Sequence, residues 1–143
     1  MATSRIALHA HLWWMARSLP FTVKRRSLRR LLAATTPLPG RMPYRGFSAG
    51  EIIDAVGETT KRPWRMGGRR CLREGLLAFR FLRLAGYPAV LHFAIEPDSV
   101  ATDSLSAHCW VTVEGVCLMN PPSPTMKRLF SWDGEFSTAG VRA

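Results

Sequence analysis

Acidic side chains are absent from the first fifty residues of this chain. The first carboxylate is Glu51, and nine lysines and arginines precede it; residues 51–143 hold the other eleven basic residues and all ten acidic ones. The net charge of +10 therefore comes almost wholly from residues 1–50. A region of one sign can attract nucleic acid, an anionic membrane surface or an acidic protein, and charge alone does not choose among them.

Cysteine is also scarce. The 143 residues contain three cysteines, an odd number without the paired spacing of small secreted disulfide scaffolds. We therefore expect a cytoplasmic protein whose thiols stay reduced. No CxxC or HxxxH spacing links Cys71, His92, Cys109 and Cys117, so we expect no zinc site, and nothing in the sequence indicates another cofactor.

Long hydrophobic runs are missing as well. Residues 6–15 are mostly apolar, but they include two histidines and are too few to span a bilayer. Lys24, Arg25 and Arg26 follow in place of the small residues of a secretory cleavage site. We interpret the stretch as an amphipathic helix whose basic side docks on a protein partner or on a membrane surface. The basic residues have no interleaved aromatic platform, so nucleic acid is not an expected partner.

Helical periodicity comes first in the chain and strand alternation afterwards, which indicates an α+β fold. The length suits one compact domain, in which a basic helical region at 1–60 packs on a core at 61–143. Helices are predicted at 5–34, with a break near Pro20, at 49–59, after a capping box of Ser48 and Glu51, and at 71–84. The predicted loops cover 35–47, 61–70 and 96–106. The predicted strands cover 90–95, 107–113 and 116–120.

Two glycines mark the helix 71–84. Gly75 costs about 1 kcal/mol of helix propensity relative to alanine, so we expect it to permit close packing of another part of the backbone. Gly86 is expected to end the helix in a left-handed conformation, and Pro88 prevents its resumption.

Cys71 opens this helix, directly after two glycines and two arginines. The unpaired N–H groups of the first turn, the helix dipole and the charges of Arg69, Arg70 and Arg73 favour a thiolate over a thiol. A thiolate in such a place is a candidate nucleophile. The alternative is an ordinary buried cysteine, which is the commoner state of a free thiol.

His108 and Asn120 lie on either side of a predicted hairpin. A two-residue turn at Glu114 and Gly115 would put their side chains on opposite faces, whereas a three-residue loop with a bulge at Gly115 makes them direct cross-strand neighbours. We favour the second register, in which the Asn120 amide oxygen accepts from a ring N–H of His108. In the alternative, His108 is a hydrogen-bonded strand histidine and Asn120 a turn residue.

Packing of the helix start against this hairpin would complete a site for nucleophilic catalysis. The Cys71 thiolate would attack a carbonyl, His108 would carry the proton to the leaving amine, and Asn120 would hold the imidazole tautomer. The expected supporting groups are the backbone N–H groups of Cys71 and Leu72 as an oxyanion hole, and Trp110 and Arg70 as lining side chains.

Two segments, CLREGLLAFRFLRLAGYPAVLHFAI and SAHCWVTVEGVCLMN, resemble the transglutaminase-like cysteine peptidases that remove the leader from lasso-peptide precursors. The resemblance covers about residues 64–122: a Cys-Leu helix, a Gly-closed turn, an Ala-His-x-Trp-Val strand and, after the next strand, a residue that is usually Asp. It implies a transglutaminase-like, papain-like core with Cys71 as the nucleophile, His108 as the base and Asn120 as the third member.

The resemblance also implies partners. Because the residues before Cys71 show helical and no β-rich pattern, we expect no leader-recognition domain among them. The chain is similar to the split form of the family, which acts with a separate leader-recognition protein and an ATP-dependent macrolactam cyclase. Two other functions stay open at this stage. The same three residues could transfer an acyl group to an amine, or the chain could be a non-catalytic basic adaptor or nucleic-acid-binding module in which Cys71 is merely buried.

Overall fold

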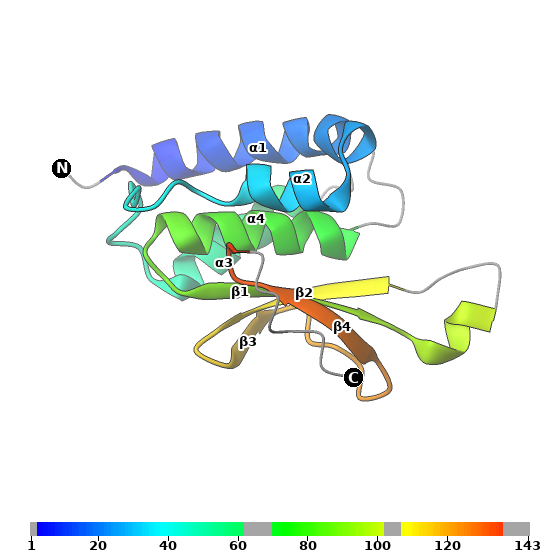
Figure 1. The fold of residues 1–143 in the computed structure, drawn as a ribbon. Helices are drawn as coiled ribbons and strands as arrows, with labels where there is room; N and C mark the ends of the chain where they lie inside the picture. Colours follow the sequence, from blue (N-terminus) through cyan, green and yellow to red (C-terminus); the bar gives the residue numbers. More distant parts are fainter. Residues whose placement is uncertain (1–2, 62–69, 102–106, 136–143) are drawn as a thin grey trace.

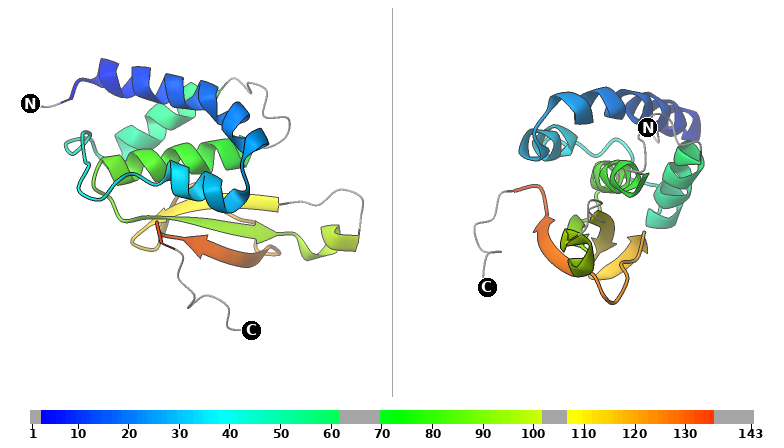
Figure 2. Two further views of the ribbon diagram at one scale, coloured as in Figure 1. Left: turned by 45° about the horizontal axis from the view of Figure 1, so that its top comes forward. Right: turned by 90° about the vertical axis from the view of Figure 1, so that its right-hand side faces the viewer.

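The computed structural model describes residues 3–61, 70–101 and 107–135. In these residues the helices come first, an antiparallel sheet follows, and the helices lie together on one face of the sheet (Figure 1). The predicted α+β fold is confirmed. Seen end-on, helix α4 (Arg70–Leu84) runs through the centre, with the other helices around it and the sheet beneath (Figure 2).

The N-terminal helices differ from the prediction at one proline. α1 (Arg5–Arg25) continues through Pro20, and the break comes at Ser27, whose side chain accepts a backbone N–H of α2 (Leu28–Thr35). The predicted break near Pro20 is therefore wrong. Proline supplies no backbone donor, but Leu19 and Pro20 are both buried, and this burial holds the turn in place.

The two helices that follow obey the local signals. α3 (Ala49–Thr60) begins at the predicted capping box, in which Glu51 N–H donates to Ser48 Oγ at 3.1 Å and Ser48 N–H donates to Glu51 Oε2 at 2.9 Å. α4 is followed by Gly86 with φ of 90°, as expected of a left-handed cap. Both predictions are confirmed, although α4 starts one residue early.

The sheet contains a strand that the sequence pattern did not reveal. The strand order is β3-β2-β1-β4, all antiparallel. Trp132, in the last of these, is buried and donates to Thr36 Oγ1 at 3.0 Å. The other residues of that edge strand are exposed, so it shows no alternation in the sequence. The bounds are β1 (Ala89–Ile95), β2 (Ala107–Val113), β3 (Val116–Met119) and β4 (Lys127–Trp132), with a short 3-10 helix at Pro97–Ala101.

The register of the β2–β3 hairpin contradicts the favoured prediction. Val113 pairs with Val116 across a two-residue turn at Glu114 and Gly115, which have φ of 50° and 81°. Two consecutive left-handed residues match the twist of a hairpin, so this turn is preferred over the three-residue loop. The register then shifts by one residue at a bulge next to Val111. His108 and Asn120 are therefore not paired in the ladder.

The loop predicted at 35–47 is confirmed between α2 and α3. The loop predicted at 61–70 falls largely outside the described residues, because 62–69, Arg69 included, are not described. Of the loop predicted at 96–106, residues 102–106 are not described, and the described part contains the 3-10 helix Pro97–Ala101. Among the described helices, none combines the length and the apolar character needed to cross a bilayer.

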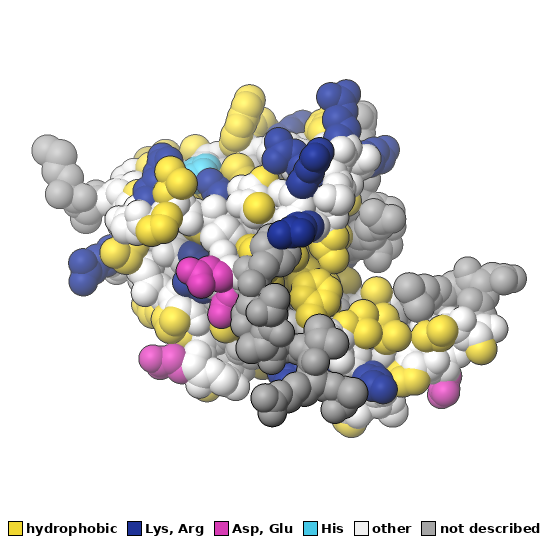
Figure 3. All heavy atoms as spheres, viewed as in Figure 1, with side chains coloured by type: hydrophobic (Ala, Val, Ile, Leu, Met, Phe, Trp, Pro, Cys, Tyr) yellow, Lys and Arg dark blue, Asp and Glu magenta, His cyan; other side chains and the backbone are white. Residues whose placement is uncertain are grey.

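The outer surface of α1 and α2 is basic and partly apolar. Dark blue side chains gather over the end of α1 and over α2 (Figure 3). Apolar side chains are exposed on α1, among them Trp14, with 67 % of its surface exposed, and Ile6, with 82 % exposed. The guanidinium of Arg17 lies 4.4 Å from the ring centre of Trp13, a cation–π contact.

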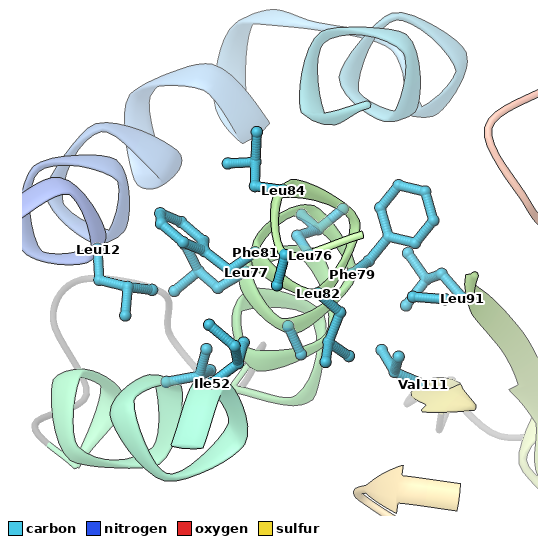
Figure 4. Close-up of a cluster of buried hydrophobic side chains, with 14 of the residues drawn as sticks. Leu12, Ile52, Leu76, Leu77, Phe79, Phe81, Leu82, Leu84, Leu91 and Val111 are labelled. Atoms are coloured by element: carbon cyan, nitrogen blue, oxygen red, sulfur yellow. The ribbon is translucent and has the colours of Figure 1, made fainter. Parts of the chain in front are cut away.

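The core is built around α4. Its apolar side chains contact α1, α3 and the sheet from a central position (Figure 4). Gly75 is where the sheet comes closest: a Cβ atom there would lie 2.9 Å from Cys109 Sγ and 3.0 Å from Leu91 Cδ1. The close packing predicted at Gly75 is confirmed, although its neighbours are side chains of the sheet rather than backbone.

Candidate active site

Cys71 lies where the start of α4 meets the start of β2. It is the second residue of the helix, it is half-buried, and its Sγ is 4.0 Å from the carbonyl oxygen of Ala107. Its backbone N–H is in the first helical turn, where donors have no acceptor within the helix. The start of α4 packs against the hairpin, but on the face of Cys109 and Val111 and not on the expected face of His108.

The surroundings of Cys71 favour its thiolate. Its pKa is lowered to about 5, chiefly by a hydrogen bond from the Cys109 side chain. A hydrogen bond from the Cys109 backbone and the charge and hydrogen bond of His108 act in the same direction, while partial burial opposes them. Cys71 is therefore ionised at neutral pH, which is the nucleophilic form of a cysteine.

Cys109 is a second thiol in contact with the first. It is buried, and its Sγ lies 2.9 Å from the carbonyl oxygen of Cys71. Its own pKa is raised, first by the hydrogen bond to Cys71, then by burial and by the negative charge of Cys71. Successive residues of β2 point to opposite faces of the sheet, so Cys109 faces α4 and His108 points to the face away from α4. Because Cys71 lies beside the start of the strand, both residues interact with its sulfur.

His108 is held by a backbone carbonyl. Its Nε2 lies 2.9 Å from the carbonyl oxygen of Asn120. A carbonyl can only accept, so Nε2 carries the proton and Nδ1 is the nitrogen left to interact with Cys71. Trp110 stacks on the His108 ring with 6.2 Å between ring centres, and His92 stacks on Trp110 at 5.2 Å. Trp110, expected to line the site, thus stacks beside the His108 imidazole.

The side chain of Asn120 does not hold His108, contrary to the expectation. Its Nδ2 donates instead to Glu74 Oε2 at 2.9 Å, on helix α4. The residue has φ of 54°, a left-handed conformation that asparagine tolerates better than most residues. The two-residue turn and the bulge place the Asn120 backbone beside His108 and direct its amide toward α4.

Glu74 is a residue of this site that the sequence reasoning missed. Its side chain is 8 % exposed and accepts hydrogen bonds from Asn120, from Arg70 Nε at 2.7 Å and from Thr60 Oγ1 at 3.3 Å. It therefore ties together α3, α4 and the end of β3. The sequence does contain a signal for this role: Glu74 is a single carboxylate, one turn after Cys71, within an apolar run. A carboxylate that such a run buries requires hydrogen-bond or ionic partners.

A comparison with models of known protein families matches residues 15–130, more than half of the chain, to the transglutaminase-like superfamily. The chain belongs to this superfamily. Catalysis in the transglutaminase-like superfamily typically depends on a cysteine, in proteases or acyltransferases. Searches of curated proteins and of solved structures gave no match.

Arg70 and Leu72, two residues expected to support the site of this transglutaminase-like chain, lie in different surroundings. Arg70 is exposed, and its Nε bonds to Glu74, so it acts on the buried carboxylate. Leu72 is half-buried and packs against the core. The oxyanion hole at the backbone N–H groups of Cys71 and Leu72 stays a prediction.

The low pKa of Cys71 predicts how fast the thiol reacts at each pH. Alkylation of Cys71 by iodoacetamide should reach half its maximal rate near pH 5, against about 8.5 for an ordinary cysteine. Cys109→Ala removes the hydrogen bond that lowers this pKa most, so its midpoint should move toward the ordinary value. Cys109→Ser keeps a donor and should stay close to wild type. Peptide mass spectrometry reads Cys71 separately, and a wild-type midpoint above pH 7 would contradict the assignment.

Proposed function

We propose that this chain is a cytoplasmic cysteine peptidase that removes the leader peptide from a lasso-peptide precursor. The single observation that carries the proposal is the position of Cys71 in the first turn of α4, with its Sγ 4.0 Å from the Ala107 carbonyl oxygen and beside His108 of β2. The pKa of Cys71, lowered to about 5, agrees with this position. Membership of the transglutaminase-like superfamily supports cysteine-based chemistry. The resemblance over about residues 64–122 supports the substrate class.

The chemistry follows from the two side chains. The Cys71 thiolate attacks the carbonyl carbon at the end of the leader, and the N–H groups of the first helical turn stabilise the oxyanion. The protonated His108 gives its Nδ1 proton to the leaving amine of the core peptide. Water, deprotonated by His108, then attacks the thioester, and the leader leaves as a free acid while Cys71 returns to its thiolate.

Asn120 and Glu74 act as positioning residues in this proposal. The Asn120 carbonyl holds Nε2 of His108 in its protonated form, and the Asn120 amide is itself held by Glu74. Glu74 is in turn bound by Arg70 and Thr60. The imidazole is therefore oriented through a chain of hydrogen bonds that ends on two helices, instead of by a carboxylate in direct contact.

The partners proposed are a separate leader-recognition protein and a macrolactam cyclase. The surface of α1 and α2 offers a place for an acidic partner, because it carries Lys24, Arg25 and Arg26 as well as exposed apolar side chains such as Trp14. The same surface suits peripheral contact with an anionic membrane. Attraction of either kind weakens as salt is added.

The test is a reconstituted reaction that contains the precursor, the recognition protein, the cyclase, ATP and this chain. We expect two products, free leader with a new carboxyl terminus and the cyclised core, both identified by mass. An acyl transferase would instead leave an adduct of the leader with an added primary amine. A complete reaction mixture that leaves the precursor intact would contradict the proposed function.

A further inference from the structure

The nucleophilic thiol has a second thiol as its neighbour. Cys109 Sγ lies 2.9 Å from the carbonyl oxygen of Cys71, and the two side chains share a hydrogen bond. Gly75 makes this possible, since a Cβ atom at that position would lie only 2.9 Å from Cys109 Sγ. The fold thus holds Cys109 against the first turns of α4, underneath Cys71.

The two thiols differ in their access to reagents. Cys71 is half-buried, whereas Cys109 is 2 % exposed. Cys71 is the ionised partner and Cys109 the protonated one. An oxidant in solution therefore reacts with Cys71 first, because it needs an accessible thiolate.

We propose that a hydroperoxide converts Cys71 and Cys109 into an intramolecular disulfide. In the first step the Cys71 thiolate attacks the terminal oxygen of the hydroperoxide, the O–O bond breaks, and an alkoxide or hydroxide leaves. Cys71 is then a sulfenic acid. In the second step the Cys109 sulfur attacks the Cys71 sulfur, the S–O bond breaks, and water leaves with the Cys109 proton.

Oxidation of Cys71 itself prepares Cys109 for the second step. The hydrogen bond to Cys71 and the Cys71 charge are two of the causes that keep the pKa of Cys109 high. Both causes depend on the Cys71 thiolate, and the thiolate is lost when the sulfenic acid forms. Burial and Glu74 still raise the pKa of Cys109, but the loss of these two causes makes its thiolate easier to form. Cys109, whose Sγ lies 2.9 Å from the Cys71 carbonyl oxygen, can then attack the neighbouring Cys71 sulfur before a second hydroperoxide carries Cys71 to the irreversible sulfinic acid.

The disulfide would be detected by mass in the full-length protein, without any substrate. The reduced chain is treated with hydrogen peroxide, blocked with iodoacetamide and digested with trypsin and a glutamyl endopeptidase. Trypsin releases Cys71 on a short peptide, and cleavage after Glu114 separates Cys109 from Cys117. We expect a linked pair that contains Cys71 and Cys109, and release of both peptides by dithiothreitol.

Matched variants decide the outcome. Cys109→Ser keeps a hydrogen-bond donor next to Cys71 but cannot form the bond, so Cys71 should accumulate as sulfinic acid that dithiothreitol does not reverse. Cys117→Ser removes the exposed cysteine of β3 and should leave the linked pair unchanged. The proposal is overturned if wild type yields sulfinic acid without a linked pair, or if Cys71 links to Cys117.

Only the consequence for activity rests on the proposed function. If that function holds, the disulfide blocks precursor cleavage and dithiothreitol restores it, while the Cys109→Ser variant stays inactive after oxidation. A linked pair in a protein that never cleaves a precursor would refute the peptidase and leave the disulfide standing. Precursor cleavage by a protein that forms no linked pair would refute the disulfide and leave the peptidase standing.

Discussion

Cys71→Ala is expected to abolish precursor cleavage, with a loss of at least about 10³-fold in the rate. The substitution removes the only sulfur that combines a position in the first turn of α4 with a hydrogen bond from His108 among the described residues. No other group there can form the thioester. The measurement is the initial rate of leader release in the reconstituted reaction.

Two controls separate chemistry from folding in this experiment. Cys117→Ala removes an exposed thiol of β3 and should leave the rate unchanged. Thermal unfolding of Cys71→Ala should stay close to that of wild type, because Cys71 is only half-buried at the edge of the core. A well-folded Cys71→Ala protein that still releases leader would show that Cys71 is not the nucleophile.

Asn120→Asp is expected to destabilise this chain, even though the family that it resembles usually has aspartate there. Asn120 Nδ2 donates to Glu74 Oε2 at 2.9 Å, and Glu74 is almost fully buried. The substitution replaces the donor by a second carboxylate that faces the first. Two like charges at this distance should lower the free energy of unfolding by about 2–4 kcal/mol at neutral pH, which urea denaturation measures.

Adding Glu74→Gln to Asn120→Asp should restore most of the lost stability. The amide is then on α4 and can donate to the carboxylate on the strand, so the pair is rebuilt with its polarity reversed. We expect a favourable coupling energy of about 1–3 kcal/mol in the double-mutant cycle. Asn120→Gly, which keeps the left-handed backbone and adds no charge, should not be rescued by Glu74→Gln. An Asn120→Asp protein as stable as wild type would refute the role given to Glu74.

The features that could be predicted are those encoded within a few residues. The capping box depends on Ser48 and Glu51 alone, and the end of α4 depends on the left-handed freedom of Gly86. The strand bounds near the site follow from alternation over seven residues in β1 and in β2. In each case the groups that form the structure are neighbours in the chain, so their interaction is visible in the sequence.

Two of the errors arose where distant segments meet, and the third arose within one hairpin. Pro20 is a helix breaker by local chemistry, but burial keeps α1 continuous. β4 has little pattern of its own and exists because β1 offers an unpaired edge. The hairpin register depends on a turn and a bulge that act together. The turn shifts the pairing by one residue and the bulge by one more, so that Val111 pairs with Met119, and the Asn120 amide meets Glu74 in place of the expected His108.

The sequence by itself determined that Cys71 would start a helix and that His108 and Asn120 would flank a hairpin, because helix and strand periods are written locally. Only the tertiary structure decided which groups surround the sulfur. Packing of α4 on the sheet at Gly75 placed Cys109 beside Cys71. The same packing buried Glu74, and a buried carboxylate takes whatever donors the fold brings to it.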